Sequence, residues 1–162
     1  MTALVRAYVG LGANLGDAAA TLERALVDLS HLPQTQLVAR SGLYRSAPID
    51  ASGPDFINAV CALDTPLPAA ELLAHLHAIE AAGGRVRGAH HAPRTLDLDL
   101  LSHGDQCSDE EHLRLPHPRA HQRAFVLVPW AEIAPDALIP GHGTVRNLLA
   151  NVAQQRIERL RS

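Results

Sequence analysis

The chain has 162 residues and a mass of 17.3 kDa, with 47% hydrophobic and 19% charged residues. This is the composition of a globular protein, and the length is that of one domain, so we expect a single domain over residues 1–162. The formal net charge of -3 excludes a polybasic surface for coating nucleic acid or binding membranes. All 14 basic residues are arginine, which excludes Schiff-base chemistry on lysine and the lysine of a Walker-type phosphate loop.

The first half of the chain predicts a strand, a helix and two further strands. Residues 4–11 are rich in aliphatic side chains and run into a glycine-bearing loop, which is typical of a strand followed by a tight turn. Residues 17–31 carry leucines three and four positions apart behind a capping Asp17, so they predict an amphipathic helix. Residues 36–45 and 56–63 predict two strands joined by a loop rich in turn-forming residues.

The second half predicts one more helix and strand before a less regular end. Residues 69–82 repeat apolar side chains at helical spacing, and residues 95–101 alternate with the period of two that a strand requires. The order βαββαβ predicts a ferredoxin-like α+β sandwich, with two helices on one face of an antiparallel sheet. A C-terminal extension of short strands and helices follows, with a strand over 137–140 and a terminal helix from Val145 onward.

The cysteines and the N-terminal residues indicate the cellular compartment that we expect for the protein. Cys61 lies in an apolar run and is expected to be a core thiol, and with Cys107 it forms no CxxC pair that would indicate zinc or redox chemistry. The first residues show no charged segment followed by a long apolar one. We therefore expect a cytoplasmic protein that binds neither membrane nor nucleic acid, and we expect a monomer.

Two carboxylates stand out on the strand predicted over 95–101. Asp97 and Asp99 are two residues apart, so they project from one strand face with Cα atoms roughly 6.6 Å apart, while the leucines that alternate with them point into the core. Adjacent carboxylates repel unless a cation neutralises them, and Mg²⁺ commonly takes one or two carboxylates together with phosphate oxygens. The pattern also fits the solvated face of an edge strand, which is the commoner meaning of a short DxD match.

Cationic side chains flank this strand along the chain. Arg85, Arg87 and Arg94 precede it in a loop with several glycines and prolines, which predicts a mobile arm over a metal site. A second cluster, between His117 and Arg123, follows it. Each of these side chains alone is more typical of a solvated surface, but guanidinium groups bind phosphate through two hydrogen bonds, so the combination favours a polyphosphate ligand.

Six segments of the chain, in this order, resemble the motifs of the 6-hydroxymethyl-7,8-dihydropterin pyrophosphokinase family: residues 9–17, 55–60, 84–87, 93–100, 115–119 and 123–129. The run Pro-Arg-Thr-Leu-Asp-Leu-Asp-Leu at 93–100 is the most distinctive. The resemblance covers nearly the whole chain. It implies ATP-dependent transfer of a diphosphate to the hydroxymethyl group of a reduced pterin, giving AMP, in folate biosynthesis. It also implies ATP as co-substrate and two Mg²⁺ ions held by Asp97 and Asp99.

The same resemblance assigns further ATP-binding positions. Arg85 and Arg94 match loop arginines that grip the polyphosphate, and with the two aspartates they form the expected catalytic set. His117 matches a phosphate-contacting histidine, and Arg123 matches an arginine near the transferred group. Glu80 matches an acid on the nucleotide side, although an exposed helix carboxylate is an equal alternative.

For the pterin, Phe56 and Phe125 match the two aromatics between which the family holds the flat ring, and they are the only phenylalanines in the chain. Asn58, on the same strand face as Phe56, matches the amide that reads the edge of the ring. Ser46 and Ile49 match loop positions that line the same pocket. Without the resemblance, core packing would be the simpler interpretation of both phenylalanines.

One departure and two alternatives remain. The loop before Arg94 lacks the tryptophan that many family members carry beside its second arginine, and His91 lies in that neighbourhood, which predicts weaker or pH-sensitive lid closure. A divergent pyrophosphokinase acting on another pterin would show the same motifs. A non-catalytic ferredoxin-like ligand-binding module would share the fold, but it would have no reason to direct two carboxylates and several arginines at one cleft.

Overall fold

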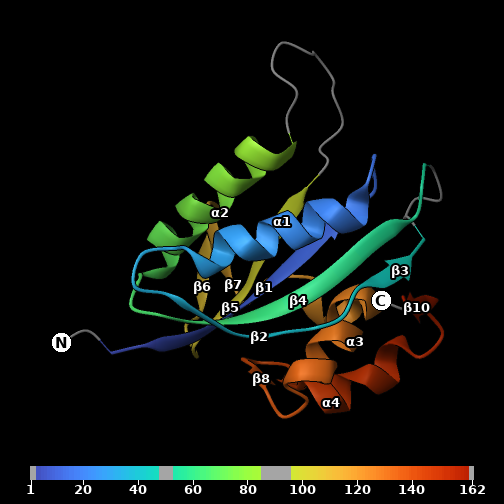
Figure 1. Ribbon diagram of the computed structural model, residues 1–162. Helices are drawn as coiled ribbons and strands as arrows, with labels where there is room; N and C mark the ends of the chain where they lie inside the picture. The colour runs from blue at the N-terminus through green and yellow to red at the C-terminus, as the bar shows by residue number, and fades with distance from the viewer. Residues whose placement is uncertain (1–2, 48–52, 85–95, 161–162) are drawn as a thin grey trace.

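The computed structural model describes residues 3–47, 53–84 and 96–160 of the chain (Figure 1). Its main sheet is antiparallel and has the strand order β10-β3-β4-β1-β5, with β2 also paired to β4. The strands are β1 (Val5–Ala13), β2 (Gln36–Arg40), β3 (Tyr44–Ser46), β4 (Phe56–Thr65), β5 (Asp97–His103) and β10 (Ile157–Arg159).

Two long helices, α1 (Ala18–Ser30) and α2 (Ala69–Gly84), cover one face of this sheet (Figure 1). Their leucines pack on the inward side chains of β1, β4 and β5 and form the larger of two buried clusters. Asp17 caps α1 by accepting a hydrogen bond from the Ala20 amide at 3.1 Å, as a helix with unpaired first amides requires. The predicted ferredoxin-like sandwich is therefore confirmed.

Residues 120–152 cover the opposite face (Figure 1). Helix α3 (Ala124–Ile133) packs on β4, and its Trp130 is fully buried with its ring centroid 5.1 Å from that of Tyr8. Because α3 meets the sheet on one side and further C-terminal elements on the other, it is apolar almost all round, as a buried helix is. The remaining elements are β6 (Ser108–Glu110), β7 (Leu113–Leu115), η1 (Ala120–Gln122), β8 (Leu138–Ile139), β9 (Gly143–Thr144), α4 (Val145–Leu148) and η2 (Leu149–Val152).

Two predicted elements differ from the structure. The strand expected over 36–45 is divided into β2 and β3, because Ser41 turns the chain by bonding through both its backbone amide and its hydroxyl to Val60 on β4. The terminal helix expected from Val145 lasts a single turn in α4 and continues as η2, after which the chain becomes strand β10. β10 pairs with the edge of β3 and forms hydrogen bonds with backbone groups that would stay unpaired on that edge if this segment were a helix.

The expectation that Cys61 is a core thiol is confirmed. Cys61 is fully buried in the core, and burial raises the pKa of its thiol to about 12. In the described parts of the chain, no helix has the length and apolar character needed to cross a membrane.

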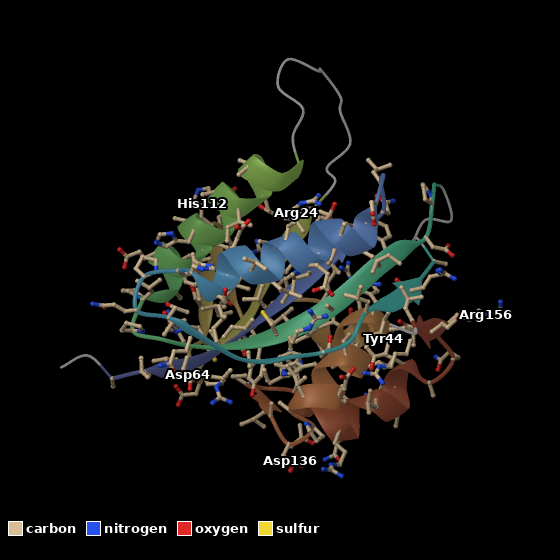
Figure 2. The ribbon with its side chains drawn as sticks, in the orientation of Figure 1. Arg24, Tyr44, Asp64, His112, Asp136 and Arg156 are labelled. Carbon is tan, nitrogen blue, oxygen red and sulfur yellow. The ribbon has the colours of Figure 1, made fainter. Side chains whose placement is uncertain are left out.

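Glu132 on α3 ties the C-terminal strand to the sheet. Its carboxylate accepts hydrogen bonds from the Gly42 amide at 3.1 Å and from the Tyr44 hydroxyl at 2.6 Å, and it pairs with Arg159 at 3.3 Å. Figure 2 shows Tyr44 on the side of the sheet that faces α3. One carboxylate thus joins α3, the turn between β2 and β3, and β10.

This arrangement predicts a loss of stability at alkaline pH. Burial, and next the hydrogen bond to Glu132, raise the pKa of Tyr44 from 10.0 to about 12. Because the folded state favours the protonated phenol, its contribution to the free energy of unfolding is complete below pH 10 and is lost as pH rises toward 12. In urea unfolding, Tyr44→Phe is expected to lose about 1 kcal/mol at neutral pH and to show a shallower alkaline decline than the wild type. Parallel pH profiles of the two proteins would contradict this.

Candidate active site

Asp97 and Asp99 lie on β5, the last strand along the main sheet's order. The leucines between and beside them are buried against α1 and α2, so both carboxylates face the opposite side of the sheet. On β1, the residues in register with Asp97 and Asp99 are Gly12 and Gly10. Directly paired residues share a face of the sheet, and glycine has no side chain, so β1 places no side chain beside the two carboxylates. The Leu101 side chain lies over Gly10, 3.4 Å from where a Cβ on residue 10 would stand.

A side chain on α2 forms a hydrogen bond with the backbone amide of Leu98, which lies between the two aspartates. Glu80 accepts a hydrogen bond from the Leu98 N–H at 2.9 Å. This side chain is half-buried and directed at β5, so it differs from the exposed helix carboxylate that the sequence left open. Glu80 therefore steadies the strand segment that carries Asp97 and Asp99.

His117 and Arg123 approach the same carboxylates from the loop before α3. The His117 amide donates to the Leu101 carbonyl at 2.9 Å, which places the loop beside β5. Burial lowers the pKa of His117, and Arg123 and Arg119 lower it further against the opposing effect of Asp99. Its Nδ1 accepts from the Arg119 amide at 3.2 Å, so the neutral ring carries its proton on Nε2 and can donate it to an anion.

The positive charge of Arg123 is only partly balanced by Asp99. Burial lowers its pKa, Arg119 lowers it further, and Asp99 opposes both. A guanidinium remains protonated under such shifts, so the charged group carries a cost from burial and from repulsion by Arg119, which a bound anion would offset.

A cavity of about 330 Å³ opens on this face of the sheet. Of the residues proposed from the sequence, it is lined by Ser46, Phe56, Asn58, Asp97, Asp99, Arg123 and Phe125. These side chains come from β3, β4, β5 and the start of α3, so the fold brings these seven predicted positions into one space. Glu80 and His117, also predicted from the sequence, are not among the lining residues.

Asn58 forms part of the cavity wall and is only 3% exposed. Its amide nitrogen donates to the Ser46 hydroxyl at 2.7 Å, which sets the orientation of the side chain. Asn58, Gly12 and Asp97 follow one another in register across β4, β1 and β5. The side-chain oxygen Oδ1 of Asn58 lies 3.5 Å from where a Cβ on residue 12 would stand, so the glycine leaves this oxygen uncovered by any side chain of residue 12.

Phe56 begins β4 and Phe125 lies in the first turn of α3. Both rings are half-buried and line the cavity, unlike Trp130 and Leu127 of the same helix, which are fully buried. The guanidinium carbon of Arg123 stands 5.4 Å from the centroid of the Phe125 ring, within the range of a cation–π contact. The two phenylalanines are therefore not ordinary core residues.

Some expectations fall elsewhere. Arg85, Arg94, Ile49 and the loop with His91 lie outside the described residues. The cavity also includes Gly10, Ala47 and Val126, which were not singled out from the sequence. Gly10 could have been found only from the β1–β5 register, because nothing in its local sequence indicates that it faces Asp99.

The donor set suits magnesium. Within the described ranges, no group of three or more His, Cys, Asp and Glu side chains converges as a metal cage would require. Two carboxylates beside a cavity are what Mg²⁺ takes when substrate phosphates complete its coordination. Asp97 and Asp99 fit such an ion.

Sequence comparisons place this geometry in a family. The family model for 7,8-dihydro-6-hydroxymethylpterin-pyrophosphokinase (HPPK) matches residues 8–135. A Pseudomonas aeruginosa protein named 2-amino-4-hydroxy-6-hydroxymethyldihydropteridine pyrophosphokinase is 46% identical over 156 residues, covering 96% of each chain. A Methylorubrum extorquens protein of the same name is 48% identical over 159 residues, covering 97% of this chain and 99% of its own.

Solved structures share the fold. A crystal structure of Plasmodium falciparum HPPK-DHPS wild type with SDX-DHP has a TM-score of 0.73 and 14% sequence identity over 91% of this chain. This chain spans 44% of that longer protein. The fold, the cavity and the sequence matches together show that the chain belongs to the 6-hydroxymethyl-7,8-dihydropterin pyrophosphokinase family.

Proposed function

We propose that this chain transfers the terminal diphosphate of ATP to the hydroxymethyl group of 6-hydroxymethyl-7,8-dihydropterin, giving AMP and the pterin diphosphate. Family membership carries the reaction class and its place in folate biosynthesis. The observation that carries the site is a single cavity in which two carboxylates, two half-buried phenylalanines and a buried amide meet. Close relatives of nearly the same length support one pyrophosphokinase domain over residues 1–162.

The pterin would lie between Phe56 and Phe125. A flat heteroaromatic ring gains apolar burial and stacking from two such side chains. Asn58 would read the donors and acceptors at the edge of the ring, because the hydrogen bond to Ser46 fixes which way its amide points. Ile49 stays a predicted contributor to this pocket.

The polyphosphate would lie over β5. Asp97 and Asp99 would hold two Mg²⁺ ions, which when bound neutralise the triphosphate and orient its groups for transfer. Glu80 would keep the backbone between the two aspartates in place through the Leu98 amide. The roles of Arg85 and Arg94 as arginines that close over the phosphates stay predictions.

The chain's own groups contribute positioning and electrostatics. The neutral His117 ring would donate its Nε2 proton to a phosphate oxygen, and Arg123 would supply a fixed positive charge beside Asp99. The cavity wall of Phe56 and Phe125 would hold the hydroxymethyl group toward the phosphates and keep water from that side. Phosphoryl transfer depends mainly on alignment and charge stabilisation, so no dedicated strong base is required.

The test is the identity of the nucleotide product. With MgATP and 6-hydroxymethyl-7,8-dihydropterin, we expect release of AMP in step with pterin diphosphate, resolved by ion-exchange chromatography. Reactions without pterin, and reactions with EDTA, serve as controls. Formation of ADP, or of no nucleotide product, would refute the proposal, and AMP formation only with a different pterin would support the divergent alternative. We also propose a monomeric, cytoplasmic enzyme that acts on small molecules alone.

A further inference from the structure

Helix α3 begins at a residue that cannot cap it. The N-cap position is Arg123, whose side chain makes no capping hydrogen bond. The first amides of a helix have no partner within the helix, and they are usually satisfied by a serine, threonine, aspartate or asparagine at this position. The acceptor for α3 must therefore come from elsewhere in the chain.

Gln155 supplies that acceptor from the C-terminal segment. Its Oε1 accepts from the Ala124 amide at 2.8 Å, and its Nε2 donates to the Gln122 carbonyl at 2.9 Å. These two backbone groups stand on either side of Arg123. A side-chain amide can accept from one and donate to the other at the same time, whereas neither a carboxylate nor an ammonium can do both.

The backbone that Gln155 holds carries one wall of the cavity. Arg123 and Phe125 both line the cavity, and their side chains lie against each other at 5.4 Å. A rotation of the chain between Gln122 and Ala124 would move both side chains together. The two hydrogen bonds of Gln155 oppose that rotation.

The same segment also contacts another part of the cavity wall. Two residues after Gln155, Ile157 of β10 pairs with Ser46 of β3, whose hydroxyl accepts from Asn58. Residues 155–157 thus contact both the Phe125 side and the Asn58 side of the cavity. The family model ends at residue 135, so this contact lies in a part of the chain that the match does not cover.

We propose that Gln155 is a positioning residue for the pterin cavity: by bonding to the backbone on both sides of Arg123, it sets the distance of Phe125 and Arg123 from the wall formed by Ser46 and Asn58. This role rests on the proposed function of the cavity. It predicts that loss of Gln155 weakens pterin binding at temperatures where the protein remains folded.

The experiment compares Gln155→Ala and Gln155→Glu with Gln154→Ala, a truncation of the exposed neighbour. Pterin Kd is measured by fluorescence titration well below the thermal midpoint of each variant, together with KM, kcat and Tm. Gln155→Ala is expected to raise pterin Kd and KM about five- to tenfold, as loss of two partly exposed hydrogen bonds implies, with a smaller change in kcat. Gln155→Glu keeps the acceptor for Ala124 but opposes the Gln122 carbonyl with an oxygen, so it is not expected to restore binding. Gln154→Ala is expected to match the wild type.

Three outcomes would overturn the proposal. If Gln155→Ala lowers Tm and leaves pterin Kd unchanged, the side chain is only a helix cap. If Gln154→Ala shows the same loss of affinity, the effect does not belong to Gln155. Phe125→Leu distinguishes failure of the proposed pterin site from failure of the positioning role. If Phe125→Leu leaves the pterin Kd unchanged, the cavity is not the pterin site, and the role of Gln155 is refuted with it. If Phe125→Leu raises the pterin Kd but Gln155→Ala does not, only the positioning role is refuted.

Discussion

Replacing Asp97 or Asp99 by asparagine is expected to lower the rate of AMP formation by roughly a thousandfold or more, because the reaction loses charge that holds cations on the triphosphate. Asparagine keeps the size of the side chain and one oxygen, so the change tests charge rather than shape. Both carboxylates face the cavity, and the β1 residues paired with them are glycines, so no side chain on β1 can replace the lost group.

The rate is measured as AMP release at saturating MgATP and pterin, and Mg²⁺ binding is measured by calorimetry in the presence of a non-hydrolysable ATP analogue. Asp109→Asn, at an exposed position on β6, is the matched control and is expected to retain wild-type activity. Tm for Asp99→Asn is expected to stay near that of the wild type, because this side chain is exposed. Activity within tenfold of the wild type in both variants would show that the aspartates are only a solvated strand face.

Replacing Phe125 or Phe56 by alanine is expected to raise the pterin Kd by roughly ten- to a hundredfold. Each ring contributes apolar burial and stacking of about 1.5–3 kcal/mol to a flat ligand, and each change of 1.4 kcal/mol is about tenfold in affinity. Because both rings are half-buried at the cavity rather than fully buried, the cost in folding stability should be smaller than for a core aromatic.

Trp130→Phe is the matched contrast, since Trp130 lies on the same helix as Phe125 and is fully buried away from the cavity. That variant is expected to lose stability in urea unfolding while keeping its pterin Kd. Pterin affinity is measured by fluorescence titration, and affinity for the ATP analogue should change little in Phe56→Ala. An unchanged pterin Kd together with a large fall in Tm would show that both phenylalanines serve only core packing.

The candidate site shows how far local patterns reach. Alternation of aspartate and leucine along one strand assigns the two carboxylates to one face, because the side-chain period of a strand is two. The motif resemblance pointed to Phe56, Asn58 and Phe125, which the structure places around one cavity. Neither pattern shows that Gly10 and Gly12 stand opposite the aspartates, because that depends on pairing between strands far apart in the chain.

The C-terminal segment shows where local patterns fail. A helix from Val145 is a reasonable expectation from its apolar spacing, but the chain forms one helical turn, then η2, then β10. The open edge of β3 and the carboxylate of Glu132 select the strand, since both require partners that the segment can reach only when extended. Contacts of this kind outweigh the small energies of local helix propensity.

The predicted βαββαβ frame, the capped first helix, the buried thiol and the shared face of Asp97 and Asp99 follow from residue type and spacing within short windows of sequence. The pairing of the two aspartates with glycines on β1 and the bonding of Gln155 to both sides of Arg123 arise when distant segments meet. Local spacing restricts each backbone segment to a few conformations, whereas register and cross-chain hydrogen bonds depend on packing against segments whose position no short window contains.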